Sequence, residues 1–104
     1  MPLFALVARD KPNMLDTRLS TRPDHVAHLQ GLGAGLKLAG PVLDGDGKPN
    51  GSLVVFEAAD EAEAQRFADG DPYAKAGVFE EVRIQPYNAA LGEWPSAPVR
   101  DEEE

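Results

Sequence analysis

The order of strand-like and helix-like segments constrains the fold of this chain more than any other feature. Residues 3–8 are apolar on both alternating sets, which is typical of a strand buried on both faces. The later segments are read from hydrophobic periodicity and turn residues. In order, we predict a helix from near Thr21 to Gly33 or Gly35, strands over 36–43 and 52–58, a helix after Asp60, a short helical piece over 71–77 and a strand over 78–87.

Local signals set the helix starts. Thr21 is a suitable cap for the first helix, because Pro23 fits a first helical turn. Asp60 with Glu63 three residues later forms a capping box for the second helix. Asp71 followed by Pro72 is the cap and first residue of the short helical piece.

Two features refine the strands. Pro41 cannot donate a ladder hydrogen bond, so the strand over 36–43 is predicted at an edge of the sheet or at a bulge. Alternation in the last strand places Val78, Val82 and Ile84 on one face and Phe79 on the other. The turn-rich residues 44–51 join the two middle strands as a hairpin.

The order strand, helix, strand, strand, helix, strand predicts an α+β, ferredoxin-like βαββαβ fold. Such a fold has one four-stranded antiparallel sheet with two helices on one face. Because the first strand is apolar on both faces, we expect the open face of the sheet to be covered by a second copy of the chain. We therefore predict a homodimer.

Composition limits the function classes. A chain of 104 residues suits one domain, and the lack of cysteine excludes disulfide and thiolate chemistry. The net charge of −8 and the scattered Lys and Arg residues argue against nucleic-acid binding. No apolar run is long enough for a membrane span, and residues 1–10 lack the basic region of a signal peptide. We expect a cytoplasmic protein with no membrane partner.

Three motifs that resemble cofactor or metal sites do not fit them, so we expect no cofactor and no metal. Residues 31–35 (GLGAG) end a helix and are followed by Leu36 where a dinucleotide loop needs glycine. Residues 44–47 (DGDG) lack the glutamate of a calcium loop, because Val55 stands at its place. His25 and His28 could share one face of a helix, but no third ligand is evident, and His28 is predicted to be a polar surface residue.

His25 and Asp71 each have a structural and a functional interpretation. With a helix start near Thr21, His25 falls in the first turn, where the helix dipole disfavours the imidazolium form. A neutral imidazole can accept a proton, as a general base must. From the residues alone, His25 as a polar residue of a helix start and Asp71 as a helix cap remain the simpler alternatives.

Three segments together resemble the YciI-like family: RLSTRPDH at 18–25, LAGP at 38–41 and DGDPYAKAGVF at 69–79. The resemblance runs from about residue 3 to residue 88. It implies a ferredoxin-like fold of the dimeric α+β barrel class that dimerises through its sheets. It also implies a His–Asp active site formed by His25 and Asp71, with Arg22 and Ser20 as substrate-binding walls. Residues 89–104, which end in acidic residues, form a C-terminal extension beyond the resemblance.

Two functions stay open at this point. Members of the family include a dehydrochlorinase of a chlorinated hydroquinone, so the resemblance implies a cofactor-free lyase or isomerase acting on a small aromatic or lactone-like substrate. In that case His25 moves a proton, Asp71 orients the imidazole, and Arg22 neutralises a substrate oxyanion. The alternative is a non-catalytic domain that binds a small molecule or takes part in an interaction.

Overall fold

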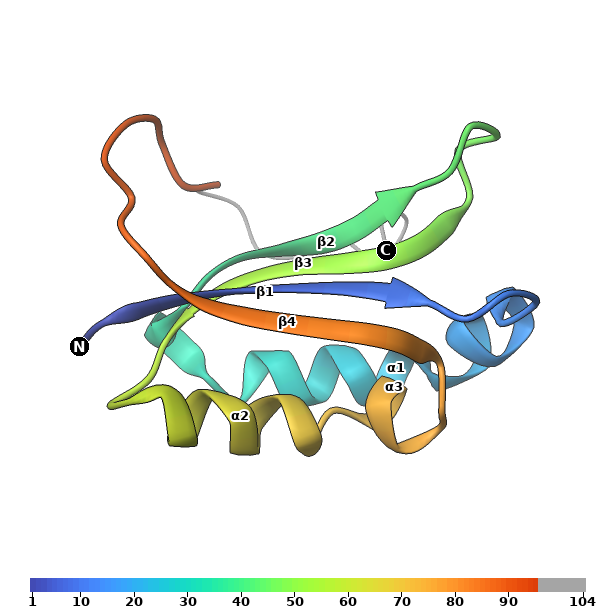
Figure 1. Ribbon diagram of the computed structural model, residues 1–104, viewed down its shortest axis with the longest axis horizontal. Helices are drawn as coiled ribbons and strands as arrows, with labels where there is room; N and C mark the ends of the chain where they lie inside the picture. Colours follow the sequence, from blue (N-terminus) through green and yellow to red (C-terminus); the bar gives the residue numbers. More distant parts are fainter. Residues whose placement is uncertain (96–104) are drawn as a thin grey trace.

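The computed structural model describes residues 1–95 (Figure 1). The chain folds into one β-sheet and one layer of helices. In chain order the elements are β1 (Leu3–Asp10), α1 (Leu15–Gln30), the 3-10 turn η1 (Gly33–Gly35), β2 (Leu36–Leu43), β3 (Pro49–Glu57), α2 (Glu61–Asp69), α3 (Pro72–Lys75) and β4 (Phe79–Tyr87).

The four strands form one antiparallel sheet in the order β2-β3-β1-β4. The helices α1, α2 and α3 all lie against the same face of this sheet (Figure 1). The predicted ferredoxin-like fold is therefore confirmed. β2 is an edge strand, as the proline at position 41 indicates.

The hydrophobic core fills the space between the sheet and the helices. One set of alternating side chains from the central strands β1 and β3 meets small and aliphatic residues of α1 and α2, which lets the helices approach the sheet closely. The buried cluster comprises Phe4, Leu6, Ala8, Leu29, Val54, Phe56, Ala58, Ala64 and Ala68. The other face of β1 is open in the single chain, where Val7 keeps 48% of its surface exposed.

The start of the first helix differs from the prediction. α1 begins at Leu15, after a turn in which Asn13 has a φ of 63°, and it continues through Pro23 to Gln30. Pro23 thus lies inside the helix, where it removes a backbone hydrogen bond, and its side chain is exposed. Interpreting Pro23 as a first-turn residue was wrong, because the helix begins two turns earlier, where Arg18 joins it to the sheet through Asp10 and Ser52.

The last strand contains a bulge that strict alternation does not anticipate. Arg9 pairs with Glu81, but the next residue, Asp10, pairs with Phe79, so Glu80 is an extra residue in β4. The bulge returns Phe79 to the helical side of the sheet, where it packs against the core together with Ile84. The prediction that Phe79 and Ile84 lie on opposite faces was therefore wrong.

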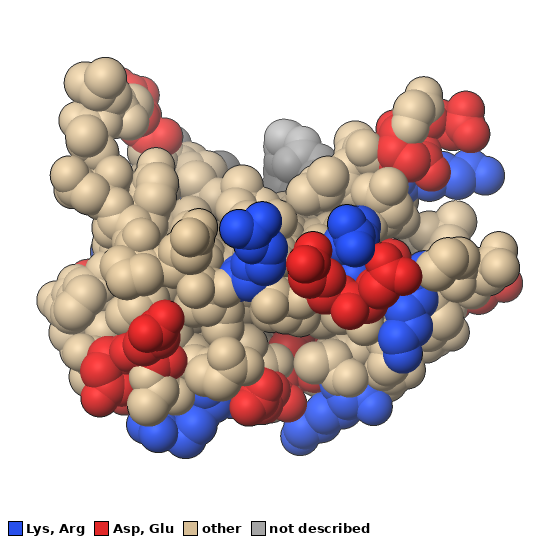
Figure 2. Space-filling view, in the orientation of Figure 1, with Lys and Arg blue, Asp and Glu red and all other residues tan. Residues whose placement is uncertain are grey.

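The hairpin between β2 and β3 is closed by Asp44. Its carboxylate accepts hydrogen bonds from the backbone N–H groups of Asp46 (2.8 Å) and Lys48 (3.0 Å), and Gly47 adopts a φ of 79° that favours glycine. The N–H of Lys48, and then that of Asp46, hold the pKa of Asp44 below its ordinary value. Acidic side chains at this hairpin tip lie beside a basic one, and both charge signs are also mixed over the rest of the visible face (Figure 2).

Two further sequence-based expectations concern the whole chain. Among the described residues, no helix is both long and apolar enough to cross a lipid bilayer. Residues 89–95 belong to no helix or strand, and the acidic end of the predicted C-terminal extension lies outside the described residues.

Candidate functional site

His25 and Asp71, which are 46 residues apart in sequence, form a buried pair. His25 projects from α1, and Asp71 lies just before α3. The Nδ1 atom of His25 is 2.9 Å from Oδ1 and 3.0 Å from Oδ2 of Asp71. Only 2% of the surface of His25 and 5% of that of Asp71 is exposed. Because a carboxylate only accepts, Nδ1–H donates to it, and Nε2 is the ring nitrogen left to exchange a proton.

Asp71 is held in place by its own helix. It has an extended backbone, it is the N-cap of α3, and its Oδ1 accepts the backbone N–H of Tyr73 at 2.9 Å. Pro72 follows at the first helical position. A backbone N–H at this position would have no acceptor within the helix, so the N–H that proline lacks costs no hydrogen bond. One carboxylate thus caps α3 and contacts His25, so the structural and functional interpretations of Asp71 are compatible.

The imidazole of His25 is also held by an aromatic stack. The ring of Tyr73 lies parallel to it, with centroids 3.8 Å apart and an angle of 15° between the planes. Tyr73 is fully buried, and its ring also makes a T-shaped contact with Phe79, with the ring centroids 6.0 Å apart. Stacking fixes the plane of the imidazole, and the bond to Asp71 fixes its rotation within that plane. A histidine restrained in this way suits proton transfer.

The predicted electrostatic reason for a neutral His25 was wrong. α1 begins at Leu15, so its positive end is several turns away from His25. The effect of a helix dipole on a side chain falls off within the first turn.

Arg22 and Ser20, the other two site residues predicted from the sequence, differ in their burial. Arg22 is partly buried and lies three residues before His25, which places it on the same side of α1. Ser20 is exposed, and its hydroxyl donates to the carbonyl of Thr17 at 3.1 Å within the helix. Arg22 therefore lies on the same side of α1 as His25, whereas Ser20 lies on the exposed surface of the helix.

His28 is not the plain surface residue predicted from the sequence. Its ring stacks on Phe67 with centroids 4.3 Å apart, and its Nε2 is 2.9 Å from the carbonyl oxygen of Phe67. Since a carbonyl can only accept, Nε2–H is the donor. His25 and His28 therefore have separate partners, and residues 1–95 contain no group of three His, Asp or Glu side chains placed to hold a metal ion.

Sequence reasoning missed Arg18, a buried charge beside this site. Its Nε donates to Asp10 at 2.7 Å, and its NH2 group donates to Asp10 at 3.0 Å and to Ser52 at 2.8 Å. Its guanidinium carbon lies 4.5 Å from the centre of the Tyr73 ring. The signal was its helical spacing, because Arg18, His25 and Leu29 fall on one stripe once the helix begins at Leu15.

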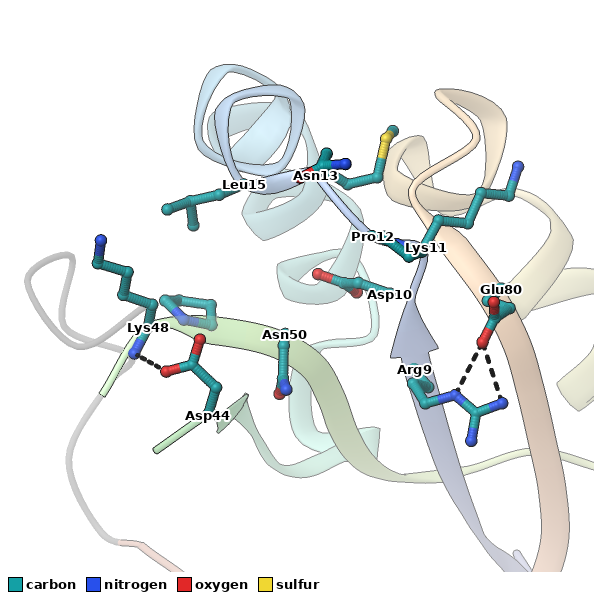
Figure 3. A pocket seen from close by; sticks show the side chains of 12 residues that line it. Arg9, Asp10, Lys11, Pro12, Asn13, Leu15, Asp44, Lys48, Asn50 and Glu80 are labelled. Atoms are coloured by element: carbon teal, nitrogen blue, oxygen red, sulfur yellow. Dashed lines mark hydrogen bonds and ion pairs between the residues drawn. The ribbon is translucent and has the colours of Figure 1, made fainter. Parts of the chain in front are cut away.

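A cleft of about 490 Å³ lies at the end of β1, beside Asp10. The β1–α1 loop forms one wall, the β2–β3 hairpin near its turn forms another, and the Arg9–Glu80 ion pair closes one side (Figure 3). A second cleft, of about 300 Å³, lies between the end of β3 and α2. Neither cleft includes His25 or Asp71 among its walls.

Comparisons with known proteins identify the family of the chain. The family model described as the YCII-related domain matches residues 2–88. Protein YciI of Escherichia coli O6:H1 is 40% identical over 93 residues, which cover 82% of this chain and 95% of that protein. An uncharacterized protein of Haemophilus influenzae is 36% identical over 93 residues, covering 81% of this chain and 94% of its own.

Among solved structures, 5-chloro-2-hydroxyhydroquinone dehydrochlorinase from Burkholderia phenoliruptrix, in complex with 2,5-dihydroxybenzoquinone, is similar to this chain. Its TM-score is 0.78 at 30% identity, over 83% of this chain and 93% of that one. An antibiotic biosynthesis monooxygenase has a TM-score of 0.55 at 12% identity, over 88% of this chain and 100% of that one, which shows the fold alone. The fold is thus that of the dimeric α+β barrel proteins.

Proposed function

The chain belongs to the YCII-related family, and we propose that it is a cofactor-free lyase or isomerase of small hydroxylated aromatic or lactone-like compounds. The observation that carries this proposal is the contact of both Asp71 oxygens with Nδ1 of the buried His25. A similar protein at 30% identity is a dehydrochlorinase whose complex holds a dihydroxybenzoquinone, which supports the substrate class.

In the proposed reaction, His25 is the general base and then the general acid. Nε2 takes a proton from a hydroxyl or an acidic C–H group of the substrate, and Asp71 stabilises the imidazolium that forms. The electron pair left on the substrate either expels a leaving group such as chloride, which is a lyase reaction, or takes the proton back at another atom, which is an isomerisation. Arg22 neutralises the oxyanion that develops on the substrate.

The test is a turnover assay with a defined panel. Chlorinated hydroxyhydroquinones, unsubstituted hydroxyhydroquinone and unsaturated lactones are incubated with the protein, and chloride release and NMR spectra of the products are followed. Turnover that disappears in His25→Ala and persists in His28→Ala supports the proposal. His28 is a matched control because it lies on the same helix and is also stacked on an aromatic ring.

A non-catalytic binding domain is the second candidate, and the burial of the pair favours it. With His25 only 2% exposed, the His–Asp contact also serves to join α1 to α3. NMR distinguishes the two functions, since a panel compound that shifts the His25 signals without being converted indicates binding alone.

We further propose that the protein acts as a homodimer joined through the open face of its sheet. Val7 of β1, Leu53 of β3 and Val42 of β2 lie on that face, and Val7 pairs directly with Leu53. Between 39% and 48% of the surface of each is exposed in the single chain. A group of aliphatic side chains on three neighbouring strands is typical of a surface that a partner covers.

A further inference from the structure

The open face of the sheet has one shielded half and one exposed half. Val55 of β3 pairs with Ala5 of β1, and both lie on this face, because the residues on either side of them along each strand belong to the core. Only 4% of the surface of Val55 is exposed, whereas Val7 and Leu53, which pair further along the same strands, keep 48% and 39%. The helices pack on the other face, so they do not explain the burial of Val55 (Figure 1).

Residues 89–95, called the arm from here on, begin beside the shielded half. β4 ends at Tyr87, which pairs with Leu3 at the start of β1. From there the arm rises on the helix-free side of the sheet (Figure 1). Its course is specified by its sequence, because Gly92 has a φ of 103°, which favours glycine. The arm is thus placed to reach Val55.

The arm carries two large apolar side chains of opposite exposure. Trp94, the only tryptophan of the chain, keeps 37% of its surface exposed, so most of this side chain is shielded by the protein. Leu91 keeps 96% of its surface exposed. One side chain therefore anchors the arm, and the other is available to a partner. An aromatic ring laid on an aliphatic side chain of a sheet buries a large apolar area.

We propose that Trp94 packs over Val55 of its own sheet, and that the arm anchored in this way forms part of the subunit interface, where Leu91 contacts a second copy of the chain. This inference rests on the proposed homodimer. It adds to that dimer a segment beyond residues 2–88, the part of the chain that the family model matches.

The shape of the open face favours a second copy as the occupant. The arm and the tip of the β2–β3 hairpin stand on the helix-free side at opposite ends of the sheet (Figure 1). The exposed pair Val7 and Leu53 lies between these ends. A flat apolar floor between two raised ends fits another sheet, since packed sheets lie about 10 Å apart. In a two-fold dimer each arm then contacts the partner subunit.

The first measurement is NMR of the Val55 methyl groups in the full chain. A Trp94 ring that lies over these groups shields them and moves their signals upfield. We expect Trp94→Ala to move the signals downfield, and the control Trp94→Phe, which keeps a ring, to move them less. Val55 signals that are the same in the wild type and in Trp94→Ala would overturn the proposed anchor.

The second measurement is subunit exchange between isotope-labelled and unlabelled copies, followed by native mass spectrometry. Leu91→Asp places a charge at the proposed contact and removes no packing within the chain, because Leu91 is almost fully exposed. We expect exchange to become about tenfold faster, since interface substitutions act mainly on the dissociation rate. Leu19→Asp is the control, because Leu19 is exposed on α1, and it should leave exchange unchanged.

Exchange in Leu91→Asp at the wild-type rate would contradict the role of the arm in the interface. Slower exchange would contradict it too, and would show that the arm obstructs the second copy. A wild type that forms no dimer would overturn both the homodimer and this inference. None of these measurements depends on turnover, so the activity of His25→Ala tests the proposed catalytic function separately.

Discussion

At the scale of single residues, Asp71 combines two tasks that one substitution separates. Asparagine caps a helix about as well as aspartate, so Asp71→Asn keeps an acceptor for the N–H of Tyr73. The amide cannot stabilise an imidazolium as the carboxylate does. We predict that turnover falls at least tenfold while stability falls by about 0.3–1 kcal/mol, the usual contribution of a charge at a helix start.

The matched control for this prediction is Asp60→Asn. Asp60 caps α2 in the same way, accepting the N–H of Glu63 at 2.8 Å, but it is exposed and distant in sequence from the His–Asp pair. Urea denaturation and turnover are measured for both variants. Equal losses of activity in the two variants would mean that Asp71 acts only as a cap.

Arg18 and Asp10 form the second pair whose contribution is measurable by substitution. Removing one partner of a buried ion pair leaves an uncompensated charge and costs about 3–5 kcal/mol. We therefore predict a large loss of unfolding free energy in Arg18→Met, against less than about 1 kcal/mol in Arg9→Met, whose ion pair is exposed. Similar denaturant midpoints for the two variants would contradict this assignment.

At the scale of elements, Pro23 lies within α1, where proline is unfavourable by about 3 kcal/mol relative to alanine. Its side chain is exposed, so replacing it removes no core contact. We predict that Pro23→Ala raises the unfolding free energy by on the order of 1–3 kcal/mol, since the backbone N–H of residue 23 becomes available to the helix. The check is chemical denaturation, and a destabilised variant would show that the proline relieves strain in the native helix.

The helices and strands also show which features of the fold can be predicted from the sequence. The order of strands and helices, the edge position of β2 and the cap before α3 follow from periodicity and turn residues. The true start of α1 could not be predicted, because tertiary bonds of Arg18 override the helix-breaking tendency of Pro23. The bulge at Glu80 was also unpredictable, since it depends on pairing with a strand about seventy residues earlier.

The candidate site was predictable only in part. The resemblance to a family singled out His25 and Asp71, and the structure places them in contact. Tyr73 and Arg18 complete the stack around His25, but that stack joins residues from α1, α3, β1 and β3. Contacts among four elements follow from the tertiary packing and cannot be read from local periodicity.

At the scale of the whole molecule, the homodimer proposal is tested at Val7. We predict that Val7→Lys, which places a charge in the middle of the open sheet face, converts the dimer into a monomer. Leu19→Lys is the control, because Leu19 is similarly exposed but lies on α1, away from the sheet face. Light scattering at micromolar concentration provides the measurement, and a wild-type monomer or a dimeric Val7→Lys would rule out this interface.

The central claim is that His25 transfers a proton to and from the substrate with the help of Asp71. The most direct test compares the turnover rate of His25→Gln with that of the wild type, on whichever panel compound the wild type converts fastest. General acid–base catalysis contributes about 10²–10⁴-fold, so we predict a loss within that range in a variant that melts like the wild type. A wild type that converts none of the compounds, or a folded His25→Gln that keeps the wild-type rate, would contradict the claim.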